Sequence, residues 1–407
     1  MYNKKDFRIN LFLALAIALV GFVMLFSLSS ELPKSIYTYR GDNSWFQGDL
    51  ARNFSNMTDM SGNVWGHHRS RVHPIFSILT LPGTALIRAI AGVGVLKSAL
   101  IFNAIVGGIW LSVLFLLSLE ITKNRIFSVL FCAYGASAAG FVFWFSVPET
   151  YPLGSLTILC AVYMVVRAQA GRHFGRLSWV GLVGSTLSIT ITNFFMGIMA
   201  ALVSFPRKQA LRIVVYALLL VMVISVVQKV IVPSSALFFL PKLGREAEFV
   251  NHKDSGALHD RVLNLLVSSV SLPEPMVESR SELLPKLSVQ ASPFANRTSL
   301  SWVGVACWIF LLGCGLLRLI GEDPRLRIYF FLTLGFQLLL HGIYGEETFL
   351  YSAHSLPILL GVALFGFRRI PAKYLYVLLS IGVIVNLTSN VSYFHQVAYA
   401  LSVADVW

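Results

Sequence analysis

Two carboxylates stand close together in a polar segment near the start of the chain. Asp42 follows Gly41, and Asp49 comes seven residues later, about two turns on if the segment is helical. A carboxylate that is partly desolvated beside a membrane has a raised pKa and can accept a proton from a hydroxyl or amine. Asp42 and Asp49 are therefore the candidate catalytic residues. The structural alternatives are a turn aspartate at position 42 and an ion pair between Asp49 and Arg52.

The same segment continues into a dense group of basic side chains: His67, His68, Arg69, Arg71 and His73. Guanidinium groups bind phosphate oxygens through a planar fork, and imidazoles can donate to them. This group predicts a site for the phosphate of a lipid-linked donor. General attraction to anionic lipid, about 1 kcal/mol per basic residue, is the alternative. A metal site is the weakest interpretation, because no ligand set with known spacing accompanies the adjacent histidines.

Further polar residues lie at the ends of apolar segments. An ionisable group is costly there unless it is hydrated or used, so such positions are candidates for contact with a substrate. Each has a structural alternative, such as a carboxylate at a helix N-terminus or a histidine hydrogen-bonded inside the protein. The substrate-binding candidates are Glu149, Tyr151, Asn193, Glu346, Glu347, Tyr351 and His354.

The composition defines the kind of protein that must position these residues. Of 407 residues, 56% are hydrophobic and 13% are charged, which excludes a water-soluble globular protein. All four cysteines lie in apolar segments, so neither disulfides nor a zinc site is indicated. The net charge of +13 is expected to orient the chain and to meet anionic head groups, and nucleic acid is not an expected partner.

Apolar runs long enough to cross a bilayer recur along the whole chain. The fold class expected is all-α and polytopic, with about 11 transmembrane helices. The run at 11–28 is interpreted as an uncleaved anchor. Nine crossings are well defined in the sequence, at 9–29, 97–119, 126–146, 151–167, 210–232, 300–320, 326–344, 350–366 and 373–391.

Three other apolar segments are not expected to be ordinary membrane crossings. Segments 178–190 and 194–205 are each short for a crossing, and they predict a broken helix pair that lines a cavity. Segment 75–92 contains Pro82 and Arg88, which favours a helix lying at the membrane surface.

This arrangement fixes the expected orientation. With a cytoplasmic N-terminus, 17 of the 32 Lys and Arg residues fall in short cytoplasmic connections, as the positive-inside rule requires. All the candidate site residues then face outward. The expected organisation is a first module at 1–232, with juxtamembrane helices and the candidate site in the outer loop 30–96. This module is followed by a long outer loop at 233–299 with amphipathic helices. The chain then ends in C-terminal transmembrane helices at 300–407.

The order of these elements resembles the GT-C class of integral-membrane glycosyltransferases. The resemblance covers about the first 210 residues, and three motifs carry it: Gly41-Asp42, Arg71-Val72-His73-Pro74-Ile75-Phe76 and Val147-Pro148-Glu149-Thr150-Tyr151. It implies a GT-C-like fold in which an acidic residue of the first outer loop, here Asp42, serves as base. It also implies a polyprenyl-phosphate sugar as donor. Asn43 stands where the mannosyltransferase branch has a second acid.

The function expected is therefore transfer of a hexose or pentose from a polyprenyl phosphate or pyrophosphate. The acceptor would be a glycan, a lipid or a protein at the outer face of the bacterial inner membrane, in contact with membrane lipids. No cofactor is expected, and a requirement for a divalent metal is left open. The alternatives are a flippase or transporter of lipid-linked oligosaccharide, which predicts ionisable residues at mid-membrane, and a polysaccharide polymerase or ligase.

Overall fold

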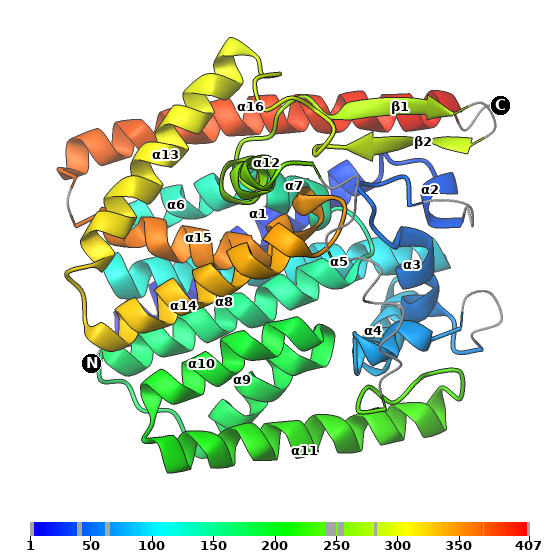
Figure 1. The fold of residues 1–407 in the computed structure, drawn as a ribbon, viewed down its shortest axis with the longest axis horizontal. Helices are drawn as coiled ribbons and strands as arrows, with labels where there is room; N and C mark the ends of the chain where they lie inside the picture. Colours follow the sequence, from blue (N-terminus) through cyan, green and yellow to red (C-terminus); the bar gives the residue numbers. More distant parts are fainter. Residues whose placement is uncertain are drawn as a thin grey trace.

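The computed structural model describes residues 4–38, 43–61, 66–240, 250, 256–280, 283–368 and 370–404. Within these ranges the chain forms sixteen α-helices, several short helical turns and one antiparallel hairpin (Figure 1). The α-helices are α1 (Lys4–Ser29), α2 (Ser35–Thr38), α3 (Leu50–Thr58), α4 (Phe76–Ala91), α5 (Val95–Thr122), α6 (Arg125–Ser137), α7 (Ala139–Trp144), α8 (Thr150–Gln169), α9 (Arg176–Ile189), α10 (Phe194–Ser204), α11 (Arg207–Ile231), α12 (Leu258–Leu263), α13 (Ser299–Leu319), α14 (Pro324–Ile343), α15 (Ser352–Gly366) and α16 (Ala372–Ala404). The hairpin strands are β1 (Met276–Arg280) and β2 (Leu283–Ser288).

Eight helical segments in the described ranges are long and apolar enough to cross a membrane, which confirms a mostly helical, membrane-embedded fold. They coincide with eight of the nine well-defined crossings. The ninth, 126–146, is divided between α6 and α7, because Ala138 has an extended backbone (ψ 139°) that interrupts the helix. The hairpin β1–β2 is an element that the sequence did not predict.

The burial pattern is that of a protein surrounded by hydrocarbon rather than water. Helix α1 exposes large apolar side chains along its length, among them Phe12 and Val20, about 70% exposed. Helix α15 is buried over all its residues and packs against α13, α8 and α14. A helix that is apolar all round is stable only when other helices or lipid cover it, so α15 forms the centre of the bundle.

The packing around α15 depends on close backbone contact. A Cβ added at Gly315 of α13 would lie 2.3 Å from the carbonyl oxygen of Val362 on α15. Small residues allow such an approach, and van der Waals contact then holds the helices together without a hydrophobic driving force from water.

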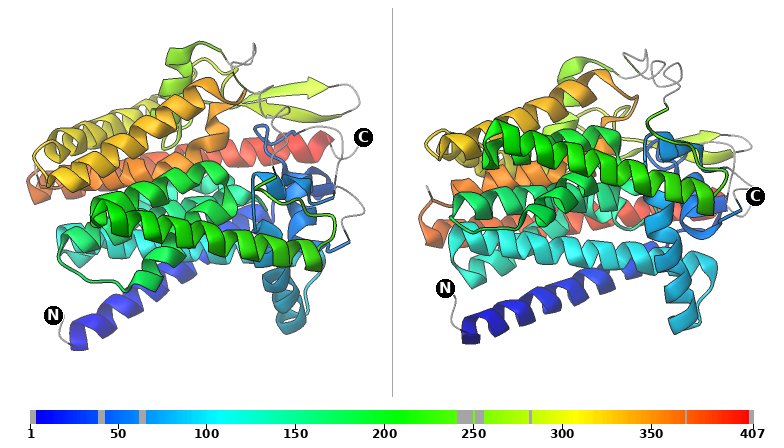
Figure 2. Two further views of the ribbon diagram at one scale, coloured as in Figure 1. Left: turned by 60° about the horizontal axis from the view of Figure 1, so that its bottom comes forward. Right: turned by 90° about the horizontal axis from the view of Figure 1, so that it is seen from below.

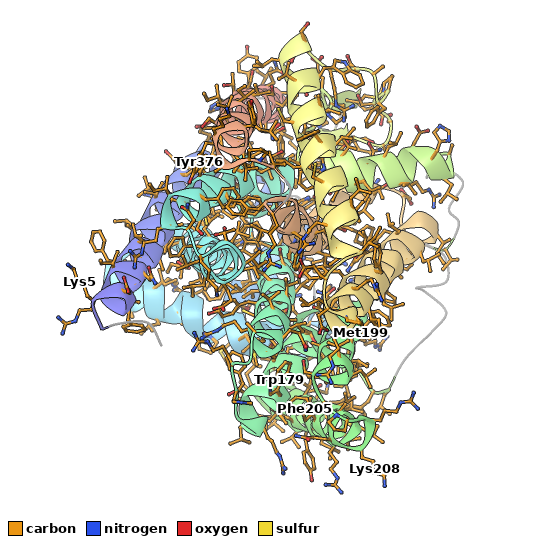
Figure 3. All side chains as sticks on the ribbon, turned by 90° about the vertical axis from the view of Figure 1, so that its left-hand side faces the viewer. Lys5, Trp179, Met199, Phe205, Lys208 and Tyr376 are labelled. Atoms are coloured by element: carbon orange, nitrogen blue, oxygen red, sulfur yellow. The ribbon has the colours of Figure 1, made fainter. Side chains whose placement is uncertain are left out.

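The basic turns of the chain lie together at one end of the bundle, at the left in Figure 1. Two ion pairs connect neighbouring segments there, between Arg125 and Asp6 (2.5 Å) and between Arg368 and Glu322 (2.8 Å). Seen from this end, Lys5 and Lys208 point away from the bundle (Figure 3). This clustering agrees with the charge asymmetry on which the expected orientation rests.

Part of the segment before α13, around Leu265 and Val270, lies inside the bundle. Leu265 and Val270 are at most 1% exposed, and the N–H groups of Ala139 and Gly140 donate to Val270 and Ser269. The break between α6 and α7 therefore receives the loop that follows α12. Among the described residues of 233–299, α12 is an α-helix of six residues, and the loop after it finds its backbone hydrogen bonds inside the protein. The amphipathic helices expected over the outer face remain a prediction.

Candidate functional site

The helix pair α9–α10 is broken by a short 3₁₀ turn, Ile191–Asn193, as the sequence predicts. The break pairs with the first loop. The N–H of Ile75 donates to Ser188 (3.0 Å), and the N–H of Ile191 donates to Val72 (3.1 Å). The irregular backbone at the break is thus satisfied by protein, which is the condition under which such backbone is tolerated within a membrane bundle.

The start of α4 is held by one side chain of α11. Pro74 lies just before α4, and the amide of Gln228 donates to its carbonyl (3.0 Å) while accepting from the N–H of Ile78 (3.0 Å). Gln228 therefore occupies the place of a normal first-turn hydrogen bond. From this anchor α4 runs across the direction of the long helices (Figure 2), as a helix lying along a membrane surface would.

Asp49 is positioned by a constrained turn. Phe46 and Gln47 both have positive φ angles (46° and 63°), which are unfavourable for residues other than glycine. The turn is held by the ring of Phe46, which is fully buried and has its centroid 5.1 Å from that of Phe349. Such strain persists only where the surroundings impose it, and it often accompanies functional positions. In this protein the constrained turn places Asp49 at the N-terminus of α3.

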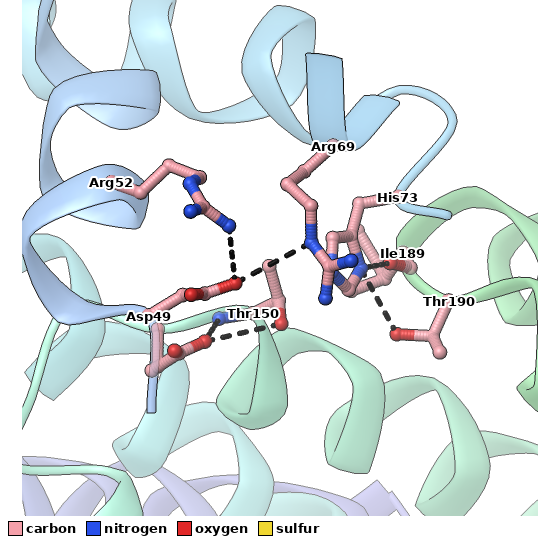
Figure 4. A network of polar contacts seen from close by, with 8 residues as sticks. Asp49, Arg52, Arg69, His73, Thr150, Ile189 and Thr190 are labelled. Atoms are coloured by element: carbon pink, nitrogen blue, oxygen red, sulfur yellow. Dashed lines mark hydrogen bonds and ion pairs between the residues drawn. The ribbon is translucent and has the colours of Figure 1, made fainter. Parts of the chain in front are cut away.

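Asp49 forms ion pairs with two arginines, and one of them, Arg52, also donates a hydrogen bond to it (Figure 4). Its Oδ2 atom lies 2.9 Å from Nη1 of Arg52 and 3.4 Å from Nε of Arg69. The side chain of Asp49 is 17% exposed, and those of the two arginines are about a third exposed. We call these three residues the Asp49 cluster. Partly exposed ion pairs contribute only about 0–1 kcal/mol to stability, so the cluster matters chiefly because it aims two guanidinium groups at one place.

His73 lies against the cluster as a neutral imidazole. Its Nδ1–H donates to the carbonyl of Ile189 (2.6 Å), which leaves Nε2 with a lone pair. Burial, followed by the positive charge of Arg69, lowers the pKa of His73 to about 3. His73 therefore brings no positive charge to a phosphate, and its available atom is a hydrogen-bond acceptor.

Glu149 brings a second carboxyl group to the same place. It precedes α8 and is 1% exposed, and its Oε2 accepts from the N–H of Thr150 (2.6 Å). Burial, followed by the negative charge of Asp49, raises the pKa of Glu149 to about 7, although the backbone N–H of Thr150 and then the side chain of Asn53 counteract the rise. A carboxyl group with this pKa can exchange a proton near neutral pH.

Aromatic and imidazole rings from three helices form a wall beside Glu149. The rings of Tyr151 and His354 have centroids 5.0 Å apart, and Tyr351 stacks on His341 at 3.9 Å. Tyr151 also lies 6.3 Å from Tyr351. The turn between α14 and α15 therefore meets the start of α8 in one cluster.

Other candidates from the sequence have structural roles. Both ring nitrogens of His67 are engaged: Nε2 donates to Asp59 (2.9 Å) and Nδ1 accepts from Ser77 (2.8 Å). Glu347 accepts from the hydroxyl of Ser288 (2.7 Å) and from three backbone N–H groups, so it fastens the hairpin to the bundle.

The remaining candidates are dispersed. His68 is exposed, Arg71 is partly buried, and Glu346 accepts from Gln47 (3.2 Å). Asp42 lies outside the described residues, so its role as base remains a prediction.

The structure adds members that sequence reasoning did not select. Arg52 joins the site through the ion pair that was the structural alternative for Asp49. Gly154 faces His354 and Asn193. The sequence feature that could have revealed it is its position three residues after Tyr151, on the same side of α8. His341 is a further addition, because its ring stacks on that of Tyr351.

A separate cavity of about 440 Å³ lies at the basic end, between the end of α10 and the start of α14. Its lining is mostly apolar, with Met199 and Phe205 among its members and Arg325 as its charged residue. It is at the opposite end of the bundle from the Asp49 cluster. Within the described ranges, no three His, Cys, Asp or Glu side chains are grouped to hold a metal ion.

Comparison of the chain with models of known protein families finds no match, and comparison with curated protein sequences finds none either.

Proposed function

We propose that this chain is an integral-membrane glycosyltransferase of the GT-C type. It would transfer a sugar from a polyprenyl phosphate or pyrophosphate to an acceptor at the outer face of the bacterial inner membrane. The observation that carries the proposal is the Asp49 cluster with Glu149 beside it, at the end of the bundle opposite the basic turns. Two aimed arginines suit a phosphate, and a buried carboxyl group suits an exchangeable proton.

The proposed reaction is a displacement at the anomeric carbon of the sugar. An oxygen or nitrogen of the acceptor attacks that carbon, and the bond from the carbon to the phosphate oxygen breaks. The electron pair leaves with the polyprenyl phosphate, and the acceptor proton passes to a carboxylate. Arg52 and Arg69 stabilise the departing negative charge, which fixed cations do well where little water competes.

Glu149 is the described carboxyl group best suited to accept the proton. Asp49 forms ion pairs with two arginines, so its Oδ2 atom is already engaged. Glu149 has a pKa raised to about 7, and it lies close enough to Asp49 to feel its charge. Asp42 is the base implied by the family resemblance, so the two assignments compete and separate variants distinguish them.

The test is sugar transfer by the purified protein in detergent, with undecaprenyl-phosphate sugars as donors and outer-membrane or peptidoglycan-derived glycan and lipid fractions as acceptors. The proposal expects a covalent product, together with release of undecaprenyl phosphate. A flippase would move the donor across proteoliposomes without changing it chemically. Transbilayer movement without any product from any donor would therefore reject the proposal, and transfer of a long glycan would indicate the polymerase or ligase alternative.

A further inference from the structure

Several buried polar atoms beside the Asp49 cluster make no hydrogen bond to the described residues. They are both amide atoms of Asn193 and the Nε2 atom of His354, in residues that are 1% exposed. A buried polar group without a partner is costly, so native proteins normally satisfy such groups with water or a ligand. Asn193 comes from the α9–α10 break and His354 from α15, so two distant segments present unused hydrogen-bonding capacity.

These atoms converge on one small part of α8. A Cβ added at Gly154 would lie 2.4 Å from Nε2 of His354 and 3.0 Å from Nδ2 of Asn193. Gly154 follows Tyr151 by three residues, so the ring of Tyr151 lies one helical turn away on the same face. The imidazole of His354 and the amide of Asn193 therefore meet on the backbone of α8 at Gly154, and Tyr151 lies close enough to Glu149 to feel its charge.

The chemistry of this region matches a sugar ring. Asn193 offers both a donor and an acceptor, and His354 offers a ring nitrogen. Hydroxyl groups around a sugar edge can both donate and accept, and the C–H faces of the ring suit the apolar body of a tyrosine. Any carboxylate on the sugar would instead meet the negative charges of Asp49 and Glu149.

We infer that Asn193, His354 and Tyr151, around Gly154, form the subsite for an uncharged, hydroxyl-rich sugar of the donor. This inference rests on the proposed function, because the phosphate of the same donor would lie on Arg52 and Arg69. It narrows the donor class to neutral hexoses or pentoses and excludes uronic acids.

Binding to the purified protein separates the two parts of the donor. The probes are undecaprenyl phosphate alone and undecaprenyl phosphates that carry glucose, galactose, mannose, arabinose or glucuronic acid. At least one neutral sugar should tighten binding about tenfold or more over undecaprenyl phosphate, as two or more added hydrogen bonds would. Glucuronic acid should add no affinity.

Variants then locate the added affinity. Asn193→Ala and His354→Ala should reduce the gain from the sugar to less than about threefold and leave binding of undecaprenyl phosphate unchanged. Asn386→Ala is the matched control, since Asn386 is equally buried but lies on α16. Gly154→Ala should act like the two alanine variants, with Gly335→Ala as its control because a Cβ at Gly335 meets nothing within 4 Å. If His354→Ala elutes as an aggregate, His354→Gln takes its place in this test.

The outcomes are distinguishable. If undecaprenyl phosphate binds but no neutral sugar adds affinity, the subsite is refuted and the phosphate site stands. The same holds if glucuronic acid adds as much affinity as a neutral sugar, or if the gain persists in the Asn193 and His354 variants. If undecaprenyl phosphate itself does not bind, the proposed function fails and the subsite fails with it.

Discussion

The carboxyl groups of Asp49 and Glu149 lie near each other but in different surroundings. Asp49 is partly exposed and forms ion pairs with two arginines, which orients their guanidinium groups. Glu149 is buried beside that negative charge, and its pKa rises to about 7. A carboxyl group with a pKa near neutral, next to cations that can bind a phosphate, is typical of sites that divide binding from proton transfer.

The raised pKa of Glu149 predicts a pH profile. A base must be deprotonated, so kcat/KM should rise about tenfold per pH unit below pH 7 and level off above it. Glu149→Gln should lower kcat/KM by about a hundredfold to ten-thousandfold and remove this rise. Glu31→Gln, an exposed acid near the same end, is the control. If Glu149→Gln keeps the profile and Asp42→Asn loses it, the base is Asp42.

At the scale of elements, the site depends on places where helices stop. The break between α9 and α10 pairs with the loop that carries His73, and the break between α6 and α7 receives the loop around Val270. Asn390 of α16 secures the second break: its amide donates to Ser137 and Val270 (2.8 Å each) and accepts from the N–H of Leu272 (3.1 Å).

Replacing Asn390 should therefore destabilise the bundle. Asn390→Ala removes three buried hydrogen bonds to backbone, at about 1 kcal/mol each, for a loss of about 3 kcal/mol. Thermal unfolding in detergent should begin several degrees lower than in Asn386→Ala, whose amide makes none of these backbone bonds. Equal midpoints for the two variants would show that the loop is not held in this way.

The sequence predicted the elements whose signal is local and missed those that depend on distant partners. Long apolar runs gave eight helices, and two short runs around Thr190 gave the broken pair. The divided helix at Ala138 and the buried loop that enters it were missed, because each satisfies the backbone of the other across more than a hundred residues.

The same limit applies to the candidate site. Residue type singled out Asp49 and Arg69 in the polar first loop and Glu149 at the end of an apolar run, and the fold brings these three together. Residue type alone could not show that these three residues belong to the candidate site and that His67 and Glu347 have structural roles. The partners of those two residues, Ser77 and the hairpin backbone, become visible only once the chain is folded.

For the whole molecule, the central feature is the asymmetry between its two ends. One end collects the basic turns, and the other holds the Asp49 cluster, the hairpin and the aromatic wall. The positive-inside rule then predicts that the second end faces away from the cytoplasm. A donor whose prenyl chain lies in the membrane could reach the cluster from that side.

Labelling of single cysteines tests this orientation. In a variant whose four cysteines are replaced by alanine, Glu278→Cys on the hairpin should react with a membrane-impermeant maleimide in intact spheroplasts. Lys208→Cys, at the basic end, should react only after permeabilisation. Both positions are exposed, so access differs only through the membrane. The reverse pattern would place the site in the cytoplasm.

The most direct measurement is release of undecaprenyl phosphate from undecaprenyl-phosphate sugar during transfer, compared between two arginine variants. Arg69→Ala should lower kcat about a hundredfold to a thousandfold, because it removes a fixed cation from the departing phosphate. Arg88→Ala should act like the unaltered protein, since Arg88 is an exposed arginine on α4 at the same end. Equal activity in the two variants would show that the Asp49 cluster does not hold the phosphate.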